Sequence, residues 1–257
     1  MLLLLPPSEG KTPVTSGDPV DLTKLSHPML ADARRRVGDA LAKVSGQRNA
    51  MKALDAGPSL ADDVARNTRL WVEPTGPAAS VYTGVLYEAA GMAAWDDATM
   101  LRAHERIRII SALWGAVSPA DLIPAYRLSM ATALGRIGPL GAFWKKHLDV
   151  PLTAVSDGSV VVDCRSSSYA AAWTPRDTPW VAIKVLRELD GKRSVVSHMA
   201  KHTRGLLTAH LMSLETAPQS PQDVADAAAG LIGVSLVDVS LEARPKGPDA
   251  LTVVVAG

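Results

Sequence analysis

The chain has 257 residues, a formal net charge of +1 and a hydrophobic fraction of 47%. This length suffices to bury a core in one large domain or two small ones, and the near-neutral charge gives no global reason to bind nucleic acid. No apolar stretch is long enough for a transmembrane helix, and Cys164 is the only cysteine, which excludes an intrachain disulfide. We therefore expect a protein of the reducing cytoplasm that makes no contact with a membrane.

The chain begins with a run of four leucines, residues 2–5, which two prolines end. An uncharged apolar run is typical of a central strand covered on both faces, and proline donates no hydrogen bond to a sheet. Ser8, Glu9 and Lys11 follow, at the position where open α/β sheets place their ligands. These residues are candidates for a functional site, and an ordinary solvated turn is the alternative.

The next hundred residues are mainly helical in pattern. Apolar residues at intervals of three and four between 26 and 44 predict an amphipathic helix, and shorter helical patterns follow at 48–54, 59–71, 86–95 and 98–105. Residues 81–85 are β-branched or aromatic apart from one glycine, which favours a strand. The helices are expected to form a layer over the sheet.

Strands and helices alternate through the remainder of the chain. Strands are predicted at 107–113, 160–164, 180–189, 193–197, 235–241 and 251–255, an extended segment at 126–130, and helices at 120–123, 140–148 and 199–214. Asp190-Gly191 supplies the positive φ angles of a tight hairpin turn. We therefore predict an α/β fold in a single domain over residues 1–257, with a mixed central sheet and flanking helices.

Histidine and cysteine often bind metals, but neither indicates a metal site in this chain. His198 and His202 have chelating spacing on a helix, but Lys201 lies between them and the sequence offers no third ligand nearby. Cys164 ends a valine-rich strand and is expected in the core. We predict neither a metal nor a cofactor.

Basic residues are concentrated between Leu101 and His147, where seven lysines and arginines accompany two acidic residues. Within this segment, Trp114-Gly115-Ala116-Val117 is similar to the hairpin of a helix-hairpin-helix, whose backbone amides bind a DNA phosphate. A simple tight turn is the alternative. Trp114, Phe143 and Trp144 are expected mainly in the core, because large aromatic side chains bury the most area.

Four further bases could form an anion site. Arginine binds phosphate with two hydrogen bonds, and lysine adds a point charge. We expect Lys11, Arg127, Lys201 and Arg204 to gather at one end of the sheet.

Six motifs in this order resemble the YaaA-like family of peroxide-stress proteins. They are Leu-Pro-Pro-Ser-Glu-Gly-Lys at the start, then 81–84, 111–115, 119–128, 143–144 and 201–206. The resemblance implies a cytoplasmic α/β protein that binds DNA through a basic cleft and a helix-hairpin-helix-like element and protects against peroxide. One departure is the missing acidic residue before Tyr169.

The expected function is therefore DNA binding by a monomer. The candidate contact residues for DNA or phosphate are Lys11, Tyr82, Thr83, Trp114, Gly115, Tyr126, Arg127, Lys201 and Arg204. The alternative is an enzyme acting on a nucleotide, a nucleobase or a DNA base. In that case Glu9 would transfer protons and Lys11 would be a nucleophilic amine in a phosphate-binding pocket.

Overall fold

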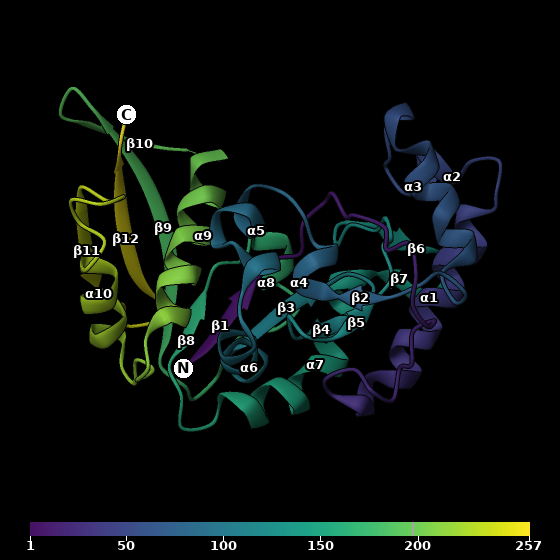
Figure 1. Ribbon diagram of the computed structural model, residues 1–257, viewed down its shortest axis with the longest axis horizontal. Helices are drawn as coiled ribbons and strands as arrows, with labels where there is room; N and C mark the ends of the chain where they lie inside the picture. The colour runs from purple at the N-terminus through teal and green to yellow at the C-terminus, as the bar shows by residue number, and fades with distance from the viewer. Residues whose placement is uncertain (197) are drawn as a thin grey trace.

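The computed structural model describes residues 1–196 and 198–257. Within them, one sheet has eight strands in the order β11-β12-β9-β8-β1-β3-β4, with β10 paired to β9 (Figure 1). These strands are β1 (Leu2–Leu5), β3 (Ile107–Ser111), β4 (Gly115–Val117), β8 (Val161–Asp163), β9 (Trp180–Leu189), β10 (Lys192–Val195), β11 (Asp238–Glu242) and β12 (Asp249–Ala256). Two small sheets pair β2 (Gly76–Pro77) with β5 (Leu122–Ile123), and β6 (Ala133–Leu134) with β7 (Gly138–Pro139).

The main sheet is mixed, as predicted. Strand β1 pairs in parallel with β3 and β8, and β9 pairs in parallel with β8 and β12. Strands β4, β10 and β11 join antiparallel. The five parallel strands therefore share one carboxyl edge. The leucines of β1 are at most 1% exposed, which confirms the predicted central strand covered on both faces.

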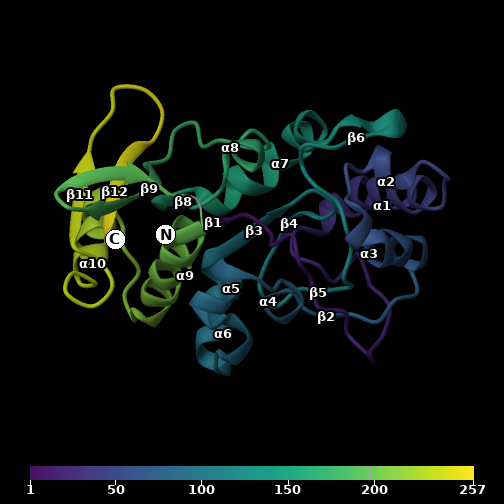
Figure 2. The ribbon, with the colours of Figure 1, turned by 90° about the horizontal axis from the view of Figure 1, so that it is seen from above.

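Ten α-helices flank the sheet in the described chain. They are α1 (Ala31–Ser45), α2 (Ala50–Ala53), α3 (Ala61–Arg66), α4 (Ala78–Val81), α5 (Val85–Ala90), α6 (Asp97–Arg106), α7 (Leu140–Ser156), α8 (Ser167–Ala170), α9 (His198–Ser213) and α10 (Pro221–Ala229). Figure 2 shows α5, α6, α9 and α10 on one face of the sheet, α7 and α8 on the other, and α1, α2 and α3 beyond β4. None of the described helices combines the length and the hydrophobicity needed to cross a membrane.

The strand predicted at 81–85 is wrong. Val81 is the last residue of α4, and α5 begins at Val85. Between the two helices, Tyr82 makes only an isolated bridge with Lys11. Gly84 has a φ of 115°, a conformation that glycine adopts without steric cost, so the chain turns between two helices instead of running on as a strand. The short helix predicted at 120–123 is likewise replaced by β5.

The hairpin predicted around Asp190-Gly191 is confirmed. Strands β9 and β10 pair antiparallel, with Leu189 opposite Lys192, and the two turn residues have φ angles of 50° and 73°. Two positive φ angles give a turn whose twist matches that of the strands. Residue 197, the predicted last residue of the second strand, lies outside the described residues.

The predicted core aromatics are buried. Trp114 and Trp144 are 0% exposed, and Phe143 is 8% exposed. Gly115 begins β4, directly after the turn from β3, and a Cβ atom there would lie 2.5 Å from the Trp144 ring. Strands flank this turn, and its residues are buried, so the helix-hairpin-helix element is not confirmed.

Helices α5 and α9 pack at unusually close range, and this places α9 next to the carboxyl edge of β1. A Cβ atom on Gly205 would overlap the carbonyl oxygen of Leu86 and lie 2.7 Å from Cβ of Ala89. Glycine at this position therefore permits the close approach of the two backbones.

We expect Gly205→Ala to lower the free energy of unfolding by about 1–3 kcal/mol, because an added methyl group overpacks this interface. Gly141→Ala in α7 is the matched control, since nothing lies within 4 Å of a Cβ atom there. Urea denaturation of the two variants measures the difference. Equal stabilities would contradict the packing argument.

Candidate functional site

A pocket of about 400 Å³ lies beyond the carboxyl ends of β1 and β8. Its lining comes from four segments that are distant in the sequence: the loop Pro6 to Gly10, the segment Thr83 to Glu88, the α8 region with Ser166 and Tyr169, and α9 with Lys201 and Arg204. Open α/β sheets bind their ligands at this edge.

Four of the sequence-predicted site residues line this pocket directly. They are Glu9, Thr83, Lys201 and Arg204. Lys11, Tyr82, Tyr126 and Arg127 form a second group that contacts the loop carrying Glu9. Glu9 connects the two groups, because it lines the pocket and also binds Arg127.

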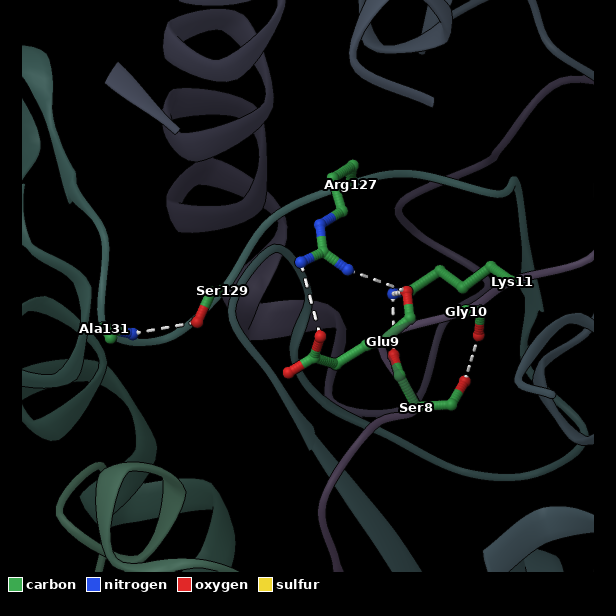
Figure 3. Close-up of polar contacts among 7 residues, drawn as sticks. All are labelled: Ser8, Glu9, Gly10, Lys11, Arg127, Ser129 and Ala131. Carbon is green, nitrogen blue, oxygen red and sulfur yellow. Dashed lines mark hydrogen bonds and ion pairs between the residues drawn. The ribbon is translucent and has the colours of Figure 1, made fainter. Parts of the chain in front are cut away.

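The pocket loop is held by two basic side chains, Lys11 and Arg127 (Figure 3). Lys11 Nζ donates hydrogen bonds to the carbonyl oxygens of Ser8 at 2.8 Å and Glu9 at 3.4 Å. Arg127 donates to the carbonyl of Glu9 at 3.4 Å and to its carboxylate at 3.3 Å. The Glu9 side chain is 77% exposed, so this ion pair is screened by water and contributes little stability. The contacts to backbone carbonyls fix the loop.

Lys11 is half-buried against two aromatic rings. Its Nζ lies 4.2 Å from the ring centre of Tyr126 and 5.5 Å from that of Tyr82. Burial of the amine and the positive charge of nearby Arg127 lower the pKa of Lys11 to about 7. These two effects outweigh the carboxylates of Glu9 and Asp63, which favour the ammonium form. A substantial fraction of this amine is therefore neutral near pH 7.

The two tyrosines are structural supports of this arrangement. The Tyr82 and Tyr126 hydroxyls lie 3.0 Å apart, and Tyr126 is 2.7 Å from the hydroxyl of Ser111. Both rings are at most 2% exposed, and burial raises the pKa of each phenol above its ordinary value. They form an uncharged wall behind Lys11.

Asn67 positions Arg127, and no sequence motif marks it for this role. Its side-chain oxygen accepts from the Arg127 backbone N–H at 2.9 Å, and its Nδ2 donates to the Arg127 carbonyl at 2.9 Å. Asn67 is fully buried and also donates to Ser45. A single asparagine in a helical pattern carries no marker of such a long-range contact.

Arg204 lines the pocket and is partly buried. Its Nη2 donates to the carbonyl of Ile183 at 2.9 Å. Its Nε is buried and has no acceptor among the described residues. Lys201, one turn earlier on α9, is exposed and lines the same pocket. The α9 side of the pocket therefore carries two cationic side chains.

Trp114 and Gly115 lie in the core and not at the pocket. Cys164 is also buried, and burial raises its pKa to about 12, which keeps the thiol protonated and unreactive. In the part of the chain that the structure describes, no group of three or more His, Cys, Asp and Glu side chains is placed to hold a metal ion.

The basic segment 101–147 divides into internal and surface residues. Arg102 and Arg106 donate to the backbone carbonyls of Met212 and Leu214, and Arg108 donates to His27. These three arginines join elements of the fold.

The exposed bases of α7 meet α1 in a basic surface formed by Arg36, Lys146 and His147. The Arg36 guanidinium lies 5.3 Å from the Phe143 ring centre, which is 4.6 Å from that of His147. Partial burial lowers the pKa of His147, and the nearby Arg36 and Lys146 lower it further. Arg36 and Lys146 therefore lie close enough to His147 to disfavour its protonation.

The depressed pKa of Lys11 predicts a pH-dependent contribution to stability. Between about 7 and the ordinary value of 10.5, the unfolded chain keeps the Lys11 proton and the folded protein releases it. The contribution of Lys11 to the free energy of unfolding therefore rises with pH across this window. Relative to Lys11→Met, wild type should gain stability from pH 7 to pH 10 in urea denaturation.

Lys24→Met, at a side chain that is 82% exposed, provides the comparison for general effects of pH. If the difference in free energy of unfolding between wild type and Lys11→Met stays constant with pH, Lys11 has the same pKa in the folded and unfolded chain, and the prediction is wrong.

Comparison with known proteins gives a consistent family assignment. The family model described as peroxide stress protein YaaA matches residues 1–230. A UPF0246 protein of Streptomyces coelicolor is 38% identical over 99% of this chain and 98% of its own length. One from Corynebacterium glutamicum is 35% identical over 99% of this chain and its entire length. The chain therefore belongs to the YaaA family of peroxide stress proteins, as its motifs suggested.

Proposed function

We propose that this protein binds a nucleotide through its phosphate in the pocket between β1, α5 and α9, as a cytoplasmic single-domain monomer. The observation that carries the proposal is the pair of cationic side chains, Arg204 and Lys201, that α9 places in the lining of the pocket. Phosphate oxygens accept charge-assisted hydrogen bonds from arginine and lysine, which are among the strong ones in proteins. Lys201 adds a second positive charge on the same side of the pocket.

The size and the mixed lining support a nucleotide over a simple anion. A volume of about 400 Å³ falls within the range of pockets that hold small organic molecules. Apolar walls from Pro6, Leu86 and Tyr87 would contact the sugar and base. The Glu9 carboxylate, on the opposite segment from α9, would accept hydrogen bonds from the uncharged part of the ligand.

In the enzyme form of this proposal, Glu9 is the residue that would transfer protons. The exposed Glu9 carboxylate lines the pocket and is free to exchange protons with a ligand. Lys11 Nζ instead donates to two loop carbonyls. We therefore propose that Lys11 and Arg127 position the loop, and that Glu9, Thr83, Lys201 and Arg204 contact the nucleotide. Tyr82 and Tyr126 support Lys11 from behind.

The Arg204→Gln variant should bind thymidine 5′-monophosphate at least about tenfold more weakly than wild type, since hydrogen bonds to charged groups contribute about 1.5–3 kcal/mol. Lys201→Gln tests the second cation at an exposed position, where folding is less at risk. Isothermal titration calorimetry measures both affinities, and inorganic phosphate serves as a second ligand.

Arg244→Gln is the matched control, because Arg244 is exposed and does not line the pocket. Unchanged affinity in both α9 variants, or no binding by wild type, would overturn the proposed pocket function.

DNA binding is the second candidate function, and the basic surface of α1 and α7 supports it. Arg36 of α1 and Lys146 of α7 bring two positive charges near His147, and Lys145 is exposed beside them. Such a surface can follow a phosphate backbone without reading bases. It is a separate set of residues from the α9 cations, so the two functions are tested independently.

For this candidate, Lys146→Ala should weaken binding to duplexes of any sequence and reduce the slope of log affinity against log salt by about one. Fluorescence anisotropy across a salt series measures the slope. Lys246→Ala, at an exposed residue in the loop between β11 and β12, is the control for net charge. An unchanged slope in Lys146→Ala would remove this surface from DNA contact.

A further inference from the structure

The amine of Lys11 has fewer oxygen acceptors than an ammonium group requires. An ammonium carries three N–H donors. Two of them face the carbonyl oxygens of Ser8 and Glu9, and the described residues supply no third oxygen acceptor within hydrogen-bond distance of Nζ, which otherwise lies beside the rings of Tyr82 and Tyr126. A neutral amine needs only two acceptors, and its lone pair then occupies the remaining position. The surroundings of Nζ therefore suit the neutral amine.

Arg127 is a neighbouring cation with spare hydrogen-bonding capacity. Its guanidinium and Lys11 Nζ both donate to the carbonyl oxygen of Glu9, at 3.4 Å each, so the two groups meet at one atom (Figure 3). Its contact with the Glu9 carboxylate is also long, at 3.3 Å, whereas charge-assisted bonds of this type are ordinarily about 2.7–2.9 Å. A further anionic oxygen placed beside Lys11 would therefore find a donor in Arg127.

The other charges around Lys11 are screened or paired. The Glu9 carboxylate is 77% exposed to water, and Asp63 forms an ion pair with Arg66 at 2.7 Å. The two phenols behind Lys11 are uncharged, because burial raises their pKa values. The amine, whose pKa is about 7, is therefore mainly neutral and nucleophilic at slightly alkaline pH.

We infer that Lys11 is a site of reversible carbamylation by carbon dioxide, with the carbamate bound to Arg127. The Nζ lone pair forms a bond to the carbon of CO2, one C=O electron pair moves onto oxygen, and one proton leaves Nζ for water. The amine R–NH2 thereby becomes R–NH–COO⁻. Its remaining N–H still donates to the Ser8 carbonyl, and only the longer contact with Glu9 is lost.

Size and charge favour CO2 over other electrophiles that modify lysine. Lys11 is half-buried beside two tyrosine rings, which a molecule of three atoms can pass more readily than an acyl donor. The carbamate is an anion that Arg127 can bind, whereas acetylation gives a neutral amide. Transfer of Arg127 to the carbamate would also release the Glu9 carboxylate, which lines the pocket.

The test exposes the protein to isotope-labelled carbon dioxide at about pH 8, above the pKa of Lys11. Triethyloxonium converts the carbamate into a stable ethyl ester, and mass spectrometry of the peptides locates the label. Wild type should carry at least about tenfold more label on Lys11 than on Lys24, which is 82% exposed and pairs with Asp21, because only a neutral amine reacts.

Arg127→Gln should lower the label on Lys11 by about tenfold, because the carbamate loses its charge-assisted hydrogen bonds. Arg69→Gln is the matched control, since the Arg69 side chain is 62% exposed and pairs with Glu73. A thermal melt verifies that both variants are folded.

Absence of label from Lys11, or equal label on Lys11 and Lys24, would overturn the inference in wild type alone, without any variant. Unchanged label in Arg127→Gln would overturn the carbamate site as described. The experiment contains no nucleotide, so its outcome is independent of the proposed function.

Discussion

The position of the site follows from the burial of β1. Four leucines at most 1% exposed require a strand with cover on both faces, and the sheet meets this requirement by placing β1 between β3 and β8. Pro6 and Pro7 then end the strand, because they have no N–H to donate to a neighbour. The polar residues after them must emerge at the carboxyl edge of the sheet. Their carbonyl groups need donors there, which Lys11 and Arg127 supply.

The buried guanidinium of Arg34 joins the α1 region to the sheet. Arg34 is 0% exposed and donates to the carbonyl oxygens of Ser26, Trp114 and Ala116. Asp121 accepts from Ser26 and from Ser118, which fixes the same loop from the other side. These bonds hold α1 against the turn between β3 and β4. The exposed Arg36 on α1 thereby gains a defined position relative to α7.

Local sequence pattern was sufficient to predict the elements that depend only on neighbouring residues. The leucine run, the Asp190-Gly191 hairpin and the long helix at 198–213 each depend on neighbouring residues and were predicted correctly in type. The segment 81–85 failed because the φ of Gly84 and the packing of α5 on α9 outweigh β propensity. Arg34 could not be told from Arg35 and Arg36 beside it, since no local feature separates an arginine that binds carbonyl groups inside the fold from one that faces water.

The roles of the site residues depended on contacts that no local pattern contains. Sequence motifs identified Glu9, Lys11, Arg127 and Arg204 without indicating which would face a ligand. That distinction depends on long-range partners, such as Asn67 for Arg127 and Ile183 for Arg204.

Several internal arginines of this protein bind carbonyl oxygens, and this explains how a chain of net charge +1 keeps localised positive regions. Arg34, Arg102 and Arg204 all donate to backbone carbonyls. A carbonyl oxygen satisfies a donor without cancelling the positive charge, whereas a carboxylate does both. Arg165 shows the contrast, because Asp163 pairs with it at 2.8 Å and neutralises it inside the fold. Arg204 therefore retains its full charge at the wall of the pocket, where a phosphate can supply the counter-charge.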